Sequence, residues 1–75
     1  QNKTAEAISA YLEAGADENN ILLTPVYLER AGMAYEMQNK KEDAIKTYKK
    51  IVEKFPSSPQ SQNIKKSLAR LGEYN

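Results

Sequence analysis

The sequence predicts an all-α fold of about four helices, arranged as an antiparallel helix–turn–helix solenoid, and three observations lead to this class. Apolar residues recur at helical spacing along most of the chain. A short polar break at residues 38–41 separates two such stretches, which makes them antiparallel neighbours. An internal repeat at an offset of 37 residues indicates that one helical unit is used more than once.

The central unit runs from Pro25 to Pro56 and reads as a helical hairpin. Its apolar and small residues follow a helical period in both halves: Leu28, Ala31, Gly32 and Tyr35, then Ala44, Ile45, Tyr48, Ile51 and Val52. Small residues at a helix crossing let the two backbones approach closely, and the tyrosines fill the space beside them. We therefore expect close packing between the two halves.

The order small-Gly-x-x-Tyr, followed by Ala44, Tyr48 and a closing proline, resembles a tetratricopeptide repeat (TPR). Gly32 precedes Pro56 by 24 residues and Ala44 precedes it by 12, which is the spacing of that repeat. Leu28 stands where tryptophan is usual in the family. The resemblance implies a TPR-like superhelix of stacked helix pairs, and it implies protein or peptide partners.

A second copy of the motif opens the chain, because residues 1–14 align with residues 38–51. The identical pairs are Gln1/Gln38, Asn2/Asn39, Lys3/Lys40, Ala7/Ala44, Ile8/Ile45 and Tyr11/Tyr48. Residues 1–23 are therefore expected to be the second helix of a preceding repeat with its loop, residues 24–58 a complete repeat, and residues 59–75 a capping helix. We expect the chain to be the C-terminal part of a repeat array that begins upstream of Gln1.

The first helix is expected from Thr4 to Ala14, with Gly15 as a left-handed stop. A polar loop follows, and it holds the three residues by which the offset exceeds the usual repeat length. Thr24 then provides a hydroxyl cap and Pro25 the first turn of the next helix, which runs to about residue 37.

Residues 39–42 resemble a capping box at the start of the third helix. Ser58 and Pro59 repeat the signal of a cap followed by proline, so a fourth helix is expected over residues 59–71, ended by Gly72. The few apolar residues of this segment fall in one stripe, which is typical of a helix that caps a solenoid.

The composition excludes several kinds of chemistry. The chain has no cysteine and no histidine, which excludes disulfides, Cys or His metal ligands and histidine-based acid–base catalysis. The acidic loop at residues 17–20 lacks the glycine and the final glutamate of a calcium loop. We therefore expect no enzyme activity, no cofactor and no metal. No apolar run approaches the ~18 residues of a membrane span, so we also expect no direct membrane insertion.

Five tyrosines and a lysine-rich third helix suggest nucleic acid as an alternative ligand. Tyr11, Tyr35 and Tyr48 occupy packing positions of the repeat, however, and carboxylates interleave with the lysines. The net charge of +1 is far from that of a strongly basic nucleic-acid-binding domain. We expect no nucleic-acid binding.

One stripe of the second helix is distinct from its packing stripe, and it consists of Val26, Glu29, Met33, Glu36 and Met37. In the repeats that this sequence resembles, these positions line the concave groove that receives peptides. Methionine adapts to irregular apolar surfaces, so the stripe suits an apolar or basic segment. The alternative is that the two methionines pack against neighbouring helices.

The function implied by the resemblance is that of a protein–protein interaction scaffold or adaptor. The closing segment at residues 48–59 is similar to TPR proteins of Gram-negative bacterial envelopes that assist assembly or secretion, which favours a periplasm-facing location over a cytoplasmic one. One alternative is a non-catalytic regulatory domain of a larger enzyme. Another is a self-assembly module.

Self-association is expected through Ile8, Tyr11 and Leu12, which the first helix of the preceding repeat would otherwise cover. Charge is unevenly divided along the chain. Residues 1–36 hold two basic and six acidic side chains, a net charge of −4, and residues 37–75 hold nine basic and four acidic, a net charge of +5. This division favours antiparallel or head-to-tail placement of two copies in a homo-oligomer.

Overall fold

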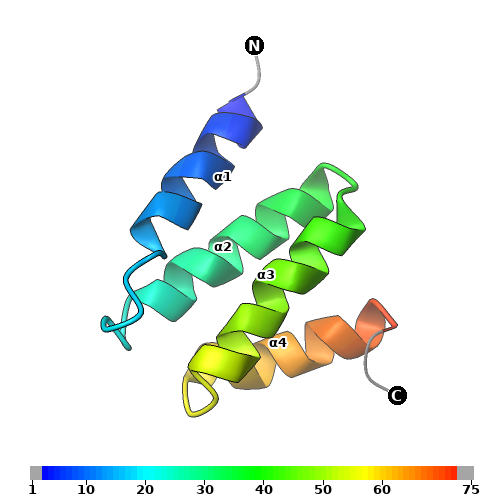
Figure 1. Ribbon diagram of the computed structural model, residues 1–75. Coiled ribbons are helices and arrows are strands. Elements are labelled where there is room, and N and C mark those ends of the chain that lie inside the picture. Colours follow the sequence, from blue (N-terminus) through cyan, green and yellow to red (C-terminus); the bar gives the residue numbers. More distant parts are fainter. Residues whose placement is uncertain (1–2, 73–75) are drawn as a thin grey trace.

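The computed structural model describes residues 3–72 of the chain, and four α-helices account for most of them (Figure 1). The helices are α1 (Lys3–Ala14), α2 (Thr24–Met37), α3 (Lys41–Lys54) and α4 (Pro59–Arg70). Consecutive helices run antiparallel, and α2 is central because it contacts the other three. The described residues contain no strand, and the predicted all-α helical-repeat fold is confirmed. Gln1 and Asn2 of the sequence repeat, and residues 73–75 of the expected capping segment, lie outside the described residues.

Small residues lie where α2 and α3 pack against each other, as the sequence predicts. Ala31 and Ala44 are fully buried. A Cβ atom on Gly32 would lie 2.2 Å from Cε1 of Tyr48, so the tyrosine ring occupies the place of a side chain at that position. The two helices can therefore approach this closely only because residue 32 is glycine.

The core lies where α2, α3 and α4 meet. It is formed by Leu28, Ala44, Tyr48, Ile51, Phe55, Ile64 and Leu68, with Leu12 of α1 and several half-buried residues packed against it. The apolar stripe of α4 thus faces α3, and its remaining surface is polar and exposed. None of the helices within residues 3–72 is both long enough and apolar enough to cross a membrane.

The end of α1 differs from the prediction. Gly15 follows Ala14 as expected, but its backbone is not in the left-handed region, so the predicted left-handed stop is wrong. A Cβ atom on Gly15 would lie 3.0 Å from Cδ2 of Leu28 and 3.1 Å from the carbonyl oxygen of Tyr11. The Leu28 side chain thus lies close against Gly15, and a larger residue there would require it to shift by a few tenths of an ångström.

The start of α2 also differs. Thr24 is the first residue of the helix, and its hydroxyl donates a hydrogen bond to the carbonyl oxygen of Asp17 instead of capping α2. No side chain among the described residues caps α2, and Asn20 instead stabilises the turn that leads into it: its side-chain oxygen accepts from the N–H of Leu23 at 3.0 Å and its carbonyl accepts from the N–H of Thr24 at 3.0 Å. The three apolar residues 21–23 form this turn, and their side chains are exposed.

The turn between α2 and α3 is a Schellman motif with asparagine in the left-handed position. Asn39 has a φ of 61°, its N–H donates to the carbonyl of Glu36 at 2.9 Å, and the N–H of Lys40 donates to the carbonyl of Tyr35 at 2.9 Å. The predicted capping box is wrong, because α3 begins without a side-chain cap. Asn39 ends α2 instead of starting α3.

The start and end of α4 follow the prediction. The Ser58 hydroxyl accepts from the N–H of Ser61 at 3.1 Å and donates to the carbonyl of Phe55 at 2.8 Å, and Pro59 opens the helix. Gly72 lies just beyond the helix with a φ of 91°, the left-handed conformation expected of it.

Candidate functional site

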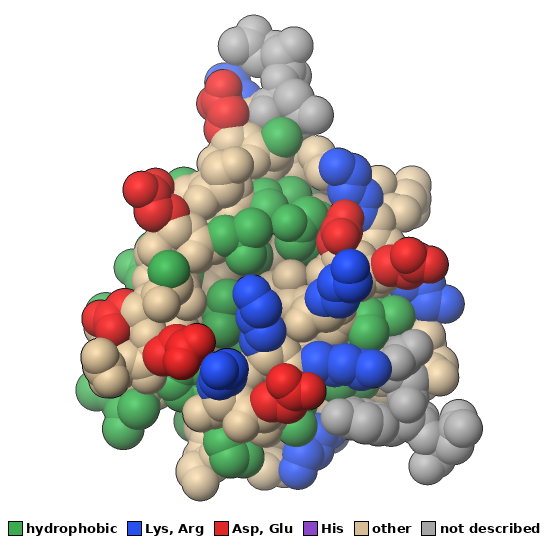
Figure 2. Space-filling view, in the orientation of Figure 1, with side chains coloured by type: hydrophobic (Ala, Val, Ile, Leu, Met, Phe, Trp, Pro, Cys, Tyr) green, Lys and Arg blue, Asp and Glu red, His purple; other side chains and the backbone are tan. Residues whose placement is uncertain are grey.

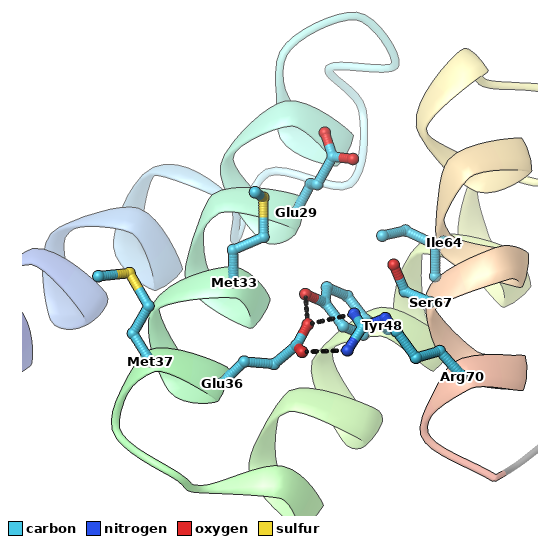
Figure 3. Close-up of a pocket in the computed structure, with 8 residues that line it drawn as sticks. All are labelled: Glu29, Met33, Glu36, Met37, Tyr48, Ile64, Ser67 and Arg70. Atoms are coloured by element: carbon cyan, nitrogen blue, oxygen red, sulfur yellow. Dashed lines mark hydrogen bonds and ion pairs between the residues drawn. The ribbon is translucent and has the colours of Figure 1, made fainter.

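An open groove of about 330 Å³ lies between α2 and α4 (Figure 3). Its walls are formed by Glu29, Met33, Glu36 and Met37 of α2, Tyr48 of α3, and Ile64, Ser67 and Arg70 of α4. Four of the five residues predicted for the groove thus line one hollow. The fifth, Val26, is half-buried and does not line it.

The two methionines make the α2 wall of the groove apolar. Met33 is 54% exposed and Met37 is 81% exposed, so neither packs into the core. The alternative in which both methionines pack against neighbouring helices does not fit these exposures. Isolated apolar side chains on a protein surface are ordinary, but two exposed methionines in one groove form a surface suited to apolar ligands, with the buried Ile64 at its base.

Three residues from three helices meet at one end of the groove, and we call them the Glu36 clasp: Glu36, Tyr48 and Arg70. Arg70 holds both carboxylate oxygens of Glu36, with Nη1 2.9 Å from Oε1 and Nη2 donating to Oε2 at 3.2 Å. The hydroxyl of Tyr48 also donates to Oε2 of Glu36. The dashed lines in Figure 3 mark these contacts, which join α2, α3 and α4 through one carboxylate.

The clasp changes the pKa of each of its members. Burial by itself raises the pKa of the Glu36 carboxyl, but the hydrogen bonds from Arg70 and Tyr48 and the charge of Arg70 outweigh it and lower this pKa below the ordinary value. Burial and the bond to Glu36 raise the pKa of Tyr48. The bond to Glu36 also raises the pKa of Arg70. At neutral pH the clasp is therefore a carboxylate neutralised by a guanidinium.

Glu29 lies at the other end of the groove, toward the loop that precedes α2 (Figure 3). Its side chain is half-buried, and burial raises the pKa of its carboxyl, while the charge of the neighbouring Arg30 opposes that rise. Within residues 3–72, no ion pair of Glu29 with a basic side chain is described. Among the described residues, Glu29 thus gives this end of the groove a carboxylate that is not engaged in an ion pair.

The α4 wall was missed by the sequence analysis. Ile64, Ser67 and Arg70 are spaced three residues apart, so they lie along one face of α4, and that spacing was a signal available in the sequence. Tyr48 was predicted as a packing residue, and its ring is fully buried as expected. The sequence held no sign that its hydroxyl would reach the groove.

The three residues predicted for self-association lie on α1 in different environments. Ile8 is buried, whereas Tyr11 and Leu12 are half-buried. Among the described helices, α1 contacts α2 alone. Hydrophobic side chains gather in the hollow between α1 and α3 in Figure 2, so any exposed apolar surface of α1 depends on Tyr11 and Leu12 more than on Ile8.

The charged surface of the chain is mixed. On the face shown in Figure 2, acidic side chains lie among the basic ones, and Lys54 of α3 pairs with Glu18 of the loop between α1 and α2 at 3.4 Å. The described part of the chain contains no group of three or more acidic, histidine or cysteine side chains placed to hold a metal ion.

A comparison with protein-family models gives one assignment. Residues 27–58 match the model described as tetratricopeptide repeat, which covers the hairpin of α2 and α3 and the turn that leads to α4. No curated protein and no solved structure shows a significant match to the chain.

Proposed function

The chain carries a tetratricopeptide repeat at residues 27–58, and from this premise we propose that it binds a segment of a partner protein in the groove between α2 and α4, as a scaffold or adaptor. Tetratricopeptide repeats generally mediate protein–protein interaction. The observation that carries the proposal is the exposure of Met33 and Met37 beside Ile64 in one groove. Methionine side chains adapt to the irregular shapes of bound apolar residues, so this wall can accept a peptide without rebuilding the core.

In this proposal the chain acts by binding alone, as tetratricopeptide repeats typically do. A protein partner is favoured over nucleic acid because acidic side chains interleave with the lysines of α3, which weakens attraction to phosphate groups.

The experiment uses a displayed library of random dodecapeptides, selected against the 75-residue chain. Peptides that bind the groove should lose affinity by about tenfold, equal to about 1.4 kcal/mol, when Met33 is changed to serine. Because Met33 is more than half exposed, Met33→Ser should change the free energy of unfolding by less than ~0.5 kcal/mol.

Leu22→Ser is the matched control, since Leu22 is 78% exposed and lies outside the groove. It should leave peptide affinity unchanged. Equal binding of the selected peptides to the Met33→Ser variant and to the unchanged protein would rule out the groove as the binding site.

We propose a finer role in assembly or secretion at a bacterial envelope, with the site facing the periplasm. Its support is the resemblance of residues 48–59 to repeats of envelope proteins. Fractionation of cells that make the full-length protein tests it: recovery in the cytosol alone would contradict the proposal. The full-length sequence distinguishes it from a regulatory domain of an enzyme, because that alternative requires a catalytic segment in the same chain.

A second candidate is self-assembly through α1, and the observation in its favour is that α1 contacts only α2 among the described helices. We propose that residues 1–23 are the second helix and loop of a preceding repeat, residues 24–58 a complete repeat and residues 59–75 a cap. Under this division one side of α1, with Tyr11 and Leu12, is available to a second copy of the chain.

A further inference from the structure

We propose that the segment bound in the groove carries a lysine or arginine that pairs with Glu29, next to apolar side chains that rest on Met33 and Met37. This inference depends on the proposed function, and it specifies the chemistry of the partner. Three observations support it: the carboxylate of Glu36 is already paired, the carboxylate of Glu29 has no described ion pair, and Glu29, Met33 and Met37 follow one another along α2.

The first observation is that Glu36 cannot serve a basic ligand. Arg70 engages both of its oxygens and Tyr48 engages one of them, and its side chain is only 21% exposed. A cation from a partner would have to compete with a guanidinium that already makes two bonds to the same carboxylate. Of the two carboxylates in the groove, only Glu29 remains for a basic partner.

The second observation is that Glu29 lines the groove, is half-buried, and has no described ion pair. A half-buried carboxylate is less well solvated than one on an open surface, so an arriving cation is screened less by water and salt. Arg30 follows Glu29 on α2, but it is exposed and does not line the groove. The lining side chains Glu29, Glu36 and Arg70 together carry one net negative charge, which attracts a basic segment.

The third observation is the order along the helix. Met33 lies one turn beyond Glu29 and Met37 lies two turns beyond it, which places the two methionines roughly 6 and 12 Å along the axis from Glu29. The clasp closes the groove at the end away from Glu29 (Figure 3). A fitting segment therefore has its basic residue at one end and apolar residues toward the clasp.

An acidic segment fits these observations poorly. Its carboxylate would lie near Glu29, and to reach Arg70 it would have to displace Glu36 from two bonds. Its recovery from a selection is an outcome that counts against the proposal.

The test starts from the dodecapeptide of highest affinity whose binding depends on Met33. Its lysine is replaced with norleucine, which has a similar length and no charge, and affinities are measured by fluorescence anisotropy. On the unchanged protein the replacement should weaken binding about fivefold, equal to about 1 kcal/mol. On the Glu29→Gln variant the two peptides should differ by less than about twofold, because the charge that distinguishes them is gone.

Glu53→Gln is the matched control, since Glu53 is an exposed glutamate of α3 outside the groove. It should keep the preference for the lysine peptide. Peptides that need Met33 but contain no basic residue, or a lysine preference that survives Glu29→Gln, would overturn this inference and leave the proposed groove intact. Failure to select any peptide that depends on Met33 would overturn both.

Discussion

The ring of Tyr48 lies against the α-carbon of Gly32, and its hydroxyl bonds to Glu36. Gly32 and Glu36 are one turn apart on α2, whereas Tyr48 belongs to α3. The Tyr48 side chain therefore packs between α2 and α3 at Gly32 and also holds the carboxylate of Glu36 in the groove. A change in the packing of the hairpin at Tyr48 should thus also change the geometry of the candidate binding site.

Gly32→Ala tests this link. Alanine in a helix interior is favoured over glycine by about 1 kcal/mol, but here its Cβ would collide with the Tyr48 ring. We expect a net loss of about 1–3 kcal/mol in urea unfolding, because overpacking outweighs the helix preference.

The double variant Gly32→Ala/Tyr48→Leu is the control for that measurement. With the ring removed, the added methyl group has room, so Gly32→Ala should cost less in the Tyr48→Leu background than in the unchanged protein. Equal costs in both backgrounds would show that the collision is not the cause.

Glu36→Gln should make the pH dependence of stability weaker in acid. The pKa of Glu36 is lowered in the folded chain, so its charge stabilises the fold above the ordinary pKa of 4.5, and that stability is lost as the pH falls through the lower folded value. At pH 7 the unchanged protein should be the more stable of the two. The difference should shrink below about pH 4.5 when urea unfolding is measured from pH 7 to pH 3. A difference that stays constant over that range would contradict a charged clasp.

Ser61→Ala should stabilise the chain. The Ser61 hydroxyl is fully buried and has no hydrogen-bond partner among the described residues, and such a group costs roughly 1–3 kcal/mol. Removing it should raise the free energy of unfolding by about 0.5–1 kcal/mol, because the small cavity left behind offsets part of the gain.

Ser58→Ala is its counterpart in the same turn of α4. The Ser58 hydroxyl caps the helix, so this change should lower stability by about 1 kcal/mol. Opposite signs in thermal unfolding are the expected result, and a loss of stability in both variants would show that the Ser61 hydroxyl has a partner.

Self-association should appear as a mass above the 8.5 kDa monomer in light scattering at millimolar protein. Tyr11→Ser should reduce self-association, since Tyr11 is the half-buried aromatic residue of α1. Added salt should reduce self-association only modestly, because at 0.1 M salt it screens charges that are more than ~10 Å apart. A monomeric mass at every concentration would contradict this candidate.

The parts of the fold that were predictable depend on local signals. The hairpin was predicted from small and aromatic residues at helical spacing, and the start of α4 from Ser58 followed by Pro59. In each case the residue acts on its own helix or on the next one, so its role can be read from sequence spacing.

The errors at helix ends arise where one residue type has two uses. Asparagine suits both a helix cap and the left-handed position after a helix, so Asn39 was assigned to the start of α3 although it ends α2. Gly15 was assigned to a left-handed stop, but its backbone is not left-handed, and the feature that distinguishes the position is its close contact with the Leu28 side chain. That contact is tertiary and has no local sign.

Only the α2 side of the groove could be predicted, because the α4 side depends on tertiary contacts. The stripe that contains Met33 and Met37 follows from helical spacing within α2. The bond between Glu36 and Arg70 spans 34 residues, and neither charge pattern nor spacing indicates such a pair before α4 is placed beside α2. The sequence predicted a carboxylate open to ligands, and the structure contains one that is already paired.

The bonds between Glu36 and Arg70 also bear on how an array of such repeats would bend. Arg70 is largely exposed, so salt weakens its attraction to Glu36, and with it the tie between α2 and α4. In a solenoid the rotation from one repeat to the next is added at every step, so a small change in angle at one joint grows along the stack. In an array of such repeats, ionic strength would then change the angle between α2 and α4 and, through it, the curvature of the whole stack.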